Sequence, residues 1–424
     1  NLDVVDIDGA VDMASTLKVG GTVLATSAAL VNSTSAGGFG FGSNNTAFYS
    51  FGPDTSTAGS YTFQNLSSNA SVNITAFKIA ADGSLSTPTL GTSNFRAGVN
   101  AGNSITSGGN YNVTVGDEAG TAITTGDQNT FVGAFSGEAT ATTADNTGLG
   151  LSTLRANTGA SNTALGSQAL RTNTTASNNT AVGYKSLYLN TTGGANTAVG
   201  SNAGTAITTG AANTCVGRDS GIAVTTGTHN TAMGYLALNT NITGTLNTAI
   251  GAEALQKTTS SNNTAVGYQA LEESTTGSEN TAVGATALAA NTTGIRNAAL
   301  GGSAGNAVTT GTTNVFVGYF SGIEGTATTT GDFNTFVGAY SHGTDATTDG
   351  ANVLGYNVAG AAGYTTIGTS GNDIRAAHGN ITWATVSDQR YKKDIVNSTA
   401  GLSFINALQP RTFKYKTLGE LPEA

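Results

Sequence analysis

Acidic side chains near the N-terminus are the first candidates for chemistry in this sequence. Asp6, Asp8 and Asp12 are spaced as the early ligands of a calcium loop are, but the rest of a twelve-residue ligand loop is missing. An Asp-Gly turn explains Asp8-Gly9 more simply. We therefore predict neither a metal site nor a cofactor.

A second set of carboxylates, Glu272, Glu273 and Glu279, could include the acid pair of a glycan-cleaving enzyme. Sparse acids on a repetitive surface more often form a solvated face. The histidines are isolated from one another and are expected at surface or packing positions: His229, His342 and His378. Since no Ser-His-Asp set, phosphate loop or nucleotide fingerprint is present, the sequence predicts a non-enzymatic protein.

Charge is scarce, at 10% of residues with a formal net charge of −9. The sequence therefore predicts no basic surface of the kind that neutralises phosphate groups, and nucleic acid is not an expected partner. No apolar run approaches the roughly 18 residues of a membrane-spanning helix, so no membrane partner is expected. The single cysteine, Cys215, excludes an intrachain disulfide framework and is expected to be buried and inert.

The elements that would position any site come from an internal repeat, because the motif Asn-Thr-Ala-Val-Gly recurs through most of the chain. The spacing is 16 or 17 residues until the last two steps of 20 and 18. The Asn of each unit is Asn112, Asn129, Asn146, Asn162, Asn179, Asn196, Asn213, Asn230, Asn247, Asn263, Asn280, Asn297, Asn314, Asn334 and Asn352.

An aliphatic residue or Met stands directly before the closing glycine of every unit, from Val115 to Leu354. We expect this column, which includes Val199, to form the internal core. The position before it is mostly Ala, and adjacent strand residues point to opposite faces. The Ala face is therefore expected to pack against other copies of the chain.

A glycine closes the motif in every unit and a second glycine follows in most Thr-Thr-Gly segments, which suits two tight corners per coil and two short strands between them. The eighth residue after Asn is Leu in some units, such as Leu187, and Gly in others, such as Gly204. No proline interrupts the array, as expected if the backbone N–H groups bond between coils. The pattern predicts a parallel β-solenoid.

The repeats resemble the head repeats of trimeric autotransporter adhesins over about residues 112–368. This resemblance implies a left-handed parallel β-roll in which three chains associate. The period of 16–17 residues is longer than that family's usual repeat, so one corner is expected to be enlarged. A single thin coil would also bury little apolar surface, which independently favours association of identical copies.

The C-terminal stretch is the only basic part of the chain, with Arg390, Lys392, Lys393, Arg411, Lys414 and Lys416. Its blocks Val386–Ile395 and Gly401–Lys416 closely resemble the opening of the intramolecular chaperone domain, the S74 peptidase family, of phage tail spikes and fibres. In that family the domain trimerises the fibre, and many members then cut themselves off.

The resemblance to the S74 family gives roles to two residues. Ser387 matches the nucleophile, with the scissile bond between Val386 and Ser387, and Lys392 matches its base. A Ser hydroxyl needs an adjacent base, and an amine serves only with a lowered pKa. A Ser-Asp pair alone would favour a helix cap at Ser387 and Asp388.

We therefore expect an all-β, trimeric, parallel β-solenoid with a small C-terminal α+β chaperone segment. The expected divisions are an N-terminal β shaft or neck at 1–44, a small β region at 45–111, the array at 112–371 and the chaperone segment at 372–424. Strand-like patches lie around Phe48–Phe51, Tyr61–Phe63 and Val72–Ile79.

The expected function is that of a structural, receptor-presenting fibre of a virion, a phage tail fibre. Its expected partners are itself, other virion proteins and a host-surface glycan or protein receptor. Two alternatives remain open: a bacterial trimeric surface adhesin located at the cell surface, and the non-catalytic part of a glycan-degrading tail spike.

Overall fold

A computed structural model of the chain describes residues 91–323 and 327–379, and outside these ranges the backbone of strands β1–β7 and β28. All regular elements in these described parts are strands, and no helix is present among them. No helix that could cross a membrane is found in the described residues. The predicted all-β class is confirmed.

The N-terminal strands pair only antiparallel. β1 (Leu17–Val19) and β2 (Thr22–Ala25) form a hairpin. A five-stranded sheet in the order β3-β4-β5-β6-β7 follows, and it starts within the segment predicted as neck. Its strands are β3 (Ala36–Phe41), β4 (Thr46–Phe51), β5 (Ser60–Leu66), β6 (Asn73–Ile79) and β7 (Leu85–Ser86).

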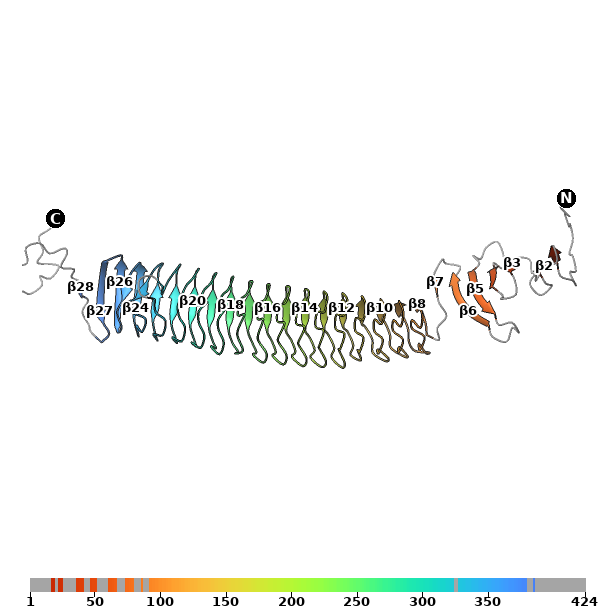
Figure 1. The fold of residues 1–424 in the computed structure, drawn as a ribbon, viewed down its shortest axis with the longest axis horizontal. Coiled ribbons are helices and arrows are strands. Elements are labelled where there is room, and N and C mark those ends of the chain that lie inside the picture. Colours follow the sequence, from red (N-terminus) through yellow and green to blue (C-terminus); the bar gives the residue numbers. More distant parts are fainter. Residues whose placement is uncertain are drawn as a thin grey trace, which may run out of the picture.

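A row of short parallel strands forms the repeat array, with each strand bonded to the next along one side of the stack (Figure 1). The strands are β8 (Phe95–Ala97), β9 (Val113–Val115), β10 (Thr130–Val132), β11 (Thr147–Leu149), β12 (Thr163–Leu165), β13 (Thr180–Val182), β14 (Thr197–Val199), β15 (Thr214–Val216), β16 (Thr231–Met233), β17 (Thr248–Ile250), β18 (Thr264–Val266), β19 (Thr281–Val283), β20 (Ala298–Leu300), β21 (Val315–Val317), β22 (Thr335–Val337), β24 (Asn352–Tyr356) and β26 (Tyr364–Thr369). This arrangement confirms the predicted parallel β-solenoid.

The array closes at its C-terminal end with a change of direction. β27 (Asn372–Ala377) pairs antiparallel with β26, and β28 (Ala384–Thr385) pairs antiparallel with β27. A separate parallel pair joins β23 (His342–Gly343) to β25 (Ala359–Gly360). The sheet of the array thus extends beyond residue 371, where the chaperone segment was predicted to begin.

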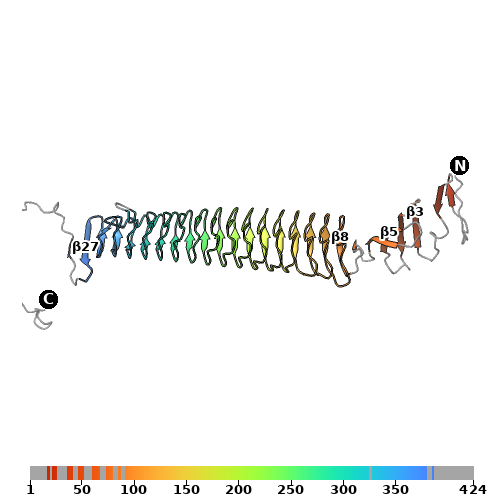
Figure 2. The same ribbon diagram turned by 60° about the horizontal axis from the view of Figure 1, so that its bottom comes forward.

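Each coil of the array contains one strand of the main sheet instead of the two predicted. Turns make up the rest of the coil and form the wall opposite the strands (Figure 2). The register is exact from coil to coil, so that Thr180, Ala181 and Val182 lie beside the same three residue types of the next coil. Equivalent side chains therefore stack in columns along the whole array.

The predicted core column is on the wrong side of the strand. Ala198, the residue before the aliphatic position, is fully buried, whereas Val199 is 37% exposed. The same inside–outside pattern holds from β10 to β22, where the middle residue of each strand is buried and is Ala, Phe or Cys, or Gly in β11. The aliphatic column therefore lies on the outer face, because the interior beside the strand has room only for the smaller residue over most coils.

Leucine from the opposite wall fills that interior. Leu187 is fully buried although its φ of 49° lies in the left-handed region. Such a backbone costs a non-glycine residue about 1–2 kcal/mol, while burying a Leu side chain contributes about 1.5–3 kcal/mol. Burial therefore offsets the strain, and Leu is retained at this corner.

Coils with glycine at this position fill the same space from elsewhere. A Cβ on Gly137 would lie 2.4 Å from the ring of Phe131, and a Cβ on Gly204 would lie 2.9 Å from Ile207 Cδ1. Phe131 and Ile207 are both fully buried. The coils predicted to be thin are thus packed by a larger residue at another position.

The closing glycine of each unit is required by the neighbouring coil. Gly183 has a φ of 126°, and a Cβ there would lie 2.5 Å from the carbonyl oxygen of Gly200. No side chain can occupy that position without separating the coils.

The array boundaries differ from the predicted ones at both ends. β8 adds a coil before Asn112, with Asn94 buried at the motif position. At the other end Asn352 lies beside Thr335, so Ala351 takes the place of the motif Asn. The last step of the repeat, from Asn334 to Ala351, is therefore 17 residues long. The 20-residue step from Asn314 to Asn334 is the longest between successive motif positions.

We predict that Ala198→Asp destabilises the array by about 3 kcal/mol or more, because an unpaired carboxylate would be buried. Thr209→Asp, at an exposed position outside the strands, should leave the coil fold intact, with a change in the free energy of unfolding of about 1 kcal/mol or less. Thermal unfolding followed by far-UV circular dichroism compares the two. If Ala198→Asp unfolded at the same temperature as the wild type, the assignment of Ala198 to the interior of the coil would be wrong.

Candidate functional site

Ser387 and Lys392 lie outside the described residues, so their geometry is not assigned. The last described element, β28, ends at Thr385. Its residues Ala384 and Thr385 lie opposite Arg375 and Ile374 of β27. The segment predicted to do chemistry thus follows directly on the antiparallel end of the array. Asp6, Asp8 and Asp12 also lie outside the described residues.

The buried asparagine that opens each coil is the most extensively bonded side chain of the array. Asn213 Nδ2 donates to the carbonyl oxygen of Gly227 at 2.8 Å. Asn213 Oδ1 accepts from both the backbone N–H and the Nδ2 of Asn230, at 3.0 and 3.1 Å. Its own N–H donates to Asn196 Oδ1 at 2.9 Å. One amide therefore joins three successive coils.

A second buried amide column lies in some of the coils with leucine at the corner. Asn173 Nδ2 donates to Asn157 Oδ1 at 2.6 Å, and Asn190 Nδ2 donates to Asn173 Oδ1 at 3.0 Å. Sequence reasoning used asparagine only as the marker of the period and missed this structural role. The signal was available in the recurrence of Asn, since a purely exposed position would vary.

We predict that Asn213→Ala lowers the free energy of unfolding by about 2–5 kcal/mol, because the Asn230 N–H and the Gly227 carbonyl would lose their buried partner. Asn239→Ala is the matched control, since that side chain is only partly buried, and its effect should stay near 0.5 kcal/mol. Chemical denaturation followed by circular dichroism measures both. Equal effects would rule out a dominant role for the buried amide.

The outer face of the sheet presents two uncharged columns. One column is formed largely by Thr, as in Thr197, and the other by the aliphatic residues. Several aliphatic members remain strongly exposed, with Leu149 at 46% and Leu300 at 54%. From β8 to β26 neither column contains a charged residue. We call this surface the outer stripe; contiguous exposed apolar surface of this kind marks an interaction site.

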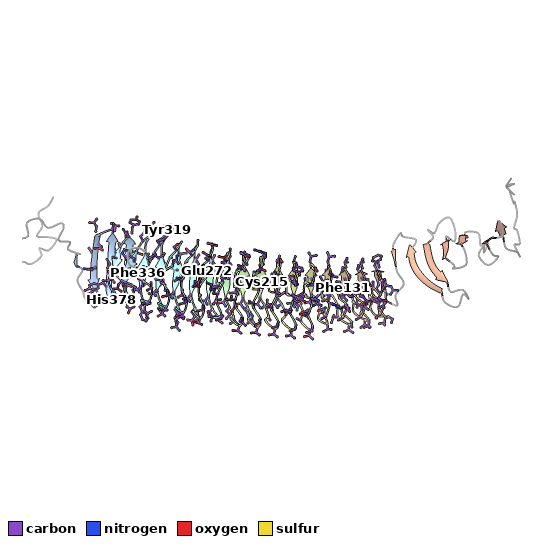
Figure 3. The ribbon with its side chains drawn as sticks, viewed as in Figure 1. Phe131, Cys215, Glu272, Tyr319, Phe336 and His378 are labelled. Atoms are coloured by element: carbon purple, nitrogen blue, oxygen red, sulfur yellow. The ribbon has the colours of Figure 1, made fainter. Side chains whose placement is uncertain are left out.

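Aromatic and basic side chains lie at the corner that follows several of the strands. Lys185 Nζ lies 5.1 Å from the ring centroid of Tyr184, and Arg218 lies 4.4 Å from that of Tyr235. Cation–π contacts of this kind contribute about 0.5–1 kcal/mol at exposed sites. Further aromatic residues, among them Tyr319, stand at the same corner toward the C-terminal end (Figure 3).

The carboxylates considered for glycan cleavage are distributed over the surface, and two of them are paired. Glu273 pairs with Lys257, and Glu279 lies 2.9 Å from Arg296 Nε. The pKa of Glu272 is raised, first by partial burial and then by the charges of Glu273 and Glu253. Two of the three candidates thus form exposed ion pairs between neighbouring coils, which fits the solvated-face interpretation.

The histidines also lie apart from one another. His342 Nδ1 is 2.9 Å from the carbonyl oxygen of Tyr340. His378 Nε2 is 3.3 Å from both Asn352 Nδ2 and Thr365 Oγ1 at the end of the sheet. His229 occupies an exposed turn with a φ of 57°. Among the described residues no group of three or more His, Cys, Asp or Glu side chains could hold a metal ion.

Cys215 occupies the interior position that is Ala in most coils, and it is 1% exposed. Gly221 leaves room for its sulfur, because a Cβ there would lie 2.6 Å from Sγ. Burial raises the pKa of the thiol to about 12. The residue is placed as a small apolar core side chain, as the sequence predicted.

We predict that a thiol reagent labels native Cys215 at pH 8 at least about a hundredfold more slowly than the urea-unfolded chain, because both burial and the raised pKa suppress the thiolate. The matched control is Thr226→Cys in a Cys215→Ala background, since position 226 is exposed. That cysteine should react at the unfolded rate. Comparable rates for the two native cysteines would show that Cys215 is accessible.

The fold and its surfaces define an elongated parallel β-solenoid with a buried amide ladder and an uncharged outer stripe. Comparison with protein families adds one finding: residues 387–423 match the family described as Chaperone of endosialidase, the S74 peptidase family. The match contains both Ser387 and Lys392 and confirms the predicted resemblance of the C-terminal segment. No curated protein and no solved structure gives a significant match to the chain.

Proposed function

We propose that the protein is a structural, receptor-presenting fibre of a virion, of the phage tail fibre kind, built from three copies of the chain. The observation that supports this most directly is the order of its parts. A long parallel β-solenoid leads through β28 to a family match for an intramolecular chaperone that begins two residues later. In tail fibres and spikes such a module assembles the elongated shaft that precedes it.

The outer stripe is the surface that the three copies would share. It is uncharged along the array, and several of its aliphatic residues are exposed, from Val199 at 37% to Leu300 at 54%. In copies related by rotation about an axis parallel to the array, each coil meets the same coil of its neighbour. This assignment replaces the Ala face, which lies inside the coil.

The proposed fibre has further partners and an alternative identity. Other virion proteins would hold it on the particle, and a host-surface glycan or protein would serve as receptor. The repeats alone favour a bacterial trimeric surface adhesin, while the chaperone match favours the virion. A non-catalytic part of a glycan-degrading spike shares the same architecture and would carry its enzyme elsewhere.

We further propose that the C-terminal segment has single-turnover chemistry, with Ser387 as nucleophile and Lys392 as base. Attack of the Ser387 hydroxyl on the Val386 carbonyl would form an ester between Val386 and the Ser387 oxygen and break the Val386–Ser387 amide bond, whose nitrogen takes up a proton as the new amino end. Water would then hydrolyse the ester, which leaves a carboxyl end at Val386 and restores the Ser387 hydroxyl. Lys392 would remove the hydroxyl proton, which requires an amine that is neutral when it acts. This chemistry would follow assembly and would not serve an external substrate.

Assembly and cleavage are tested together by comparing the full chain with one that ends at Thr385. We expect three chains by light scattering for the first and poor, aggregated assembly for the second. Mass spectrometry should detect a fragment that begins at Ser387, and Ser387→Ala or Lys392→Ala should abolish it while the trimer persists.

The possible outcomes separate the claims. A stable folded monomer of the longer chain would refute the fibre proposal. Equal assembly of the shorter chain would refute the chaperone role. An uncut wild-type chain would refute only the self-cleavage.

A further inference from the structure

Four aromatic side chains form a continuous cluster on one corner of the last coils. Tyr319 and Phe320 follow β21, Tyr340 follows β22, and Tyr356 ends β24. The ring centroids of Tyr319 and Tyr340 are 5.7 Å apart, those of Tyr340 and Tyr356 are 5.8 Å apart, and those of Tyr319 and Phe320 are 4.5 Å apart. We call these residues the aromatic ridge; Tyr319 marks it at the edge of the array in Figure 3.

The ridge stays open to solvent although its rings contact one another. Tyr319 is 53% exposed and Tyr356 is 55% exposed. Tyr319 also lies against the preceding coil, because a Cβ on Gly302 would come within 3.3 Å of its ring. Phe320 and Tyr340 stack at 5.9 Å with an interplanar angle of 26°. The rings are therefore held in fixed positions by their neighbours, and exposed ring surface remains available.

The environment of the ridge is uncharged, unlike the rest of this corner. In coils nearer the N-terminus, Lys185 lies over the ring of Tyr184 and Arg218 lies over the ring of Tyr235. From Gly302 to Asn357, the two positions after each closing glycine are Gly-Ser, Tyr-Phe, Ala-Tyr and Tyr-Asn. None of these eight side chains is charged, so the corner offers aromatic surface bordered by neutral hydrogen-bonding groups.

The geometry points to an uncharged pyranose oligosaccharide as the ligand of the aromatic ridge. The axial C–H bonds on one face of a pyranose ring stack on aromatic faces, and the ring's hydroxyl groups point outward toward polar neighbours. The ring centroids of successive coils are 5.7 and 5.8 Å apart, close to the length of one sugar unit in an extended chain. Tyr340 meets both Tyr319 and Tyr356 edge to face at 87°, so the sugar rings would stack on the exposed faces of Tyr319 and Tyr356. Neutral surroundings favour a neutral sugar over an acidic one.

The area available also favours a small ligand over a protein. A fully covered aromatic side chain buries about 150–250 Å². Tyr319 and Tyr356 are about half exposed and would each contribute about 100 Å², while Phe320 and Tyr340 are only partly exposed, so the four together offer less than about 400 Å². A stable protein interface needs about 800 Å² on each partner. The ridge is therefore too small for a protein partner, but it can hold two or three sugar units.

This inference rests on the receptor-presenting role proposed above and names the chemical class of the receptor. Saturation-transfer NMR tests it on the intact protein with maltohexaose, cellohexaose and chitohexaose as probes and sialyllactose as the acidic comparison. Because ring stacking depends on the C–H face more than on the hydroxyl pattern, at least one neutral hexaose should show saturation of its ring protons.

The double variant Tyr319→Ala/Tyr356→Ala should weaken that binding about tenfold or more, since each stacked ring contributes to affinity. Tyr268→Ala is the matched control: Tyr268 is 53% exposed at the same corner, outside the cluster. It should bind as the wild type does. Circular dichroism should confirm that both variants remain folded.

Absence of a neutral-sugar signal, or equal binding by the double variant, would overturn the inference. Loss of oligomerisation in the double variant would overturn it too, because the ridge would then be an interface between copies. Light scattering on the same samples keeps the two proposals apart. A monomeric wild type with tyrosine-dependent sugar binding would refute the fibre and leave the sugar site intact.

Discussion

Amide-to-backbone hydrogen bonding between successive coils is the constraint on which the rest of the array depends. Most motif Asn side chains donate to a carbonyl in the following coil and accept the N–H of the next Asn, as Asn213 does with Gly227 and Asn230. A buried amide left without these partners costs about 1–3 kcal/mol per group. These bonds fix the register of each coil relative to the next. The other side-chain columns, inside and outside the coil, are therefore aligned in the same register.

With the coils held in register, the narrow interior decides the side chains. Ala198 leaves room for leucine from the opposite wall, and Leu187 enters at the cost of a left-handed backbone. Where glycine replaces that leucine, Phe131 or Ile207 occupies the space. Volume is therefore conserved within each coil, although residue types change from coil to coil. Because most strands have a small residue such as Ala on the inner face, the aliphatic residues lie outside, where they form the outer stripe.

The periodicity predicts the solenoid, its stacking and the glycine corners well, because these follow from the spacing alone. It does not decide which strand face is internal. Alternation places Ala198 and Val199 on opposite sides, and the larger side chain was assigned inward; the coil's small cross-section reverses that choice. The sequence also misplaced the last repeat, because Asn352 was taken as its motif residue. Strand pairing instead places Ala351 at that position, where its backbone N–H bonds to Asn334. The aromatic ridge was not predicted because its members come from different coils and no sequence motif joins them.

The regularity of the array would make it difficult to align the chains of the proposed trimer. Coils such as those of β13 and β14 present the same Thr-Ala-Val residues, so two copies displaced by one coil would lose only the contacts of the overhanging coil. The displaced and aligned arrangements are therefore separated by a small part of the interface energy. Irregular coils would favour the aligned arrangement. The enlarged unit between Asn314 and Asn334, for example, matches only the same unit of a neighbouring copy. A module that joins the chains at one end, beyond β28, would set their relative positions along the array before the outer stripes come into contact. The family match at residues 387–423 places a candidate for that module directly after the array.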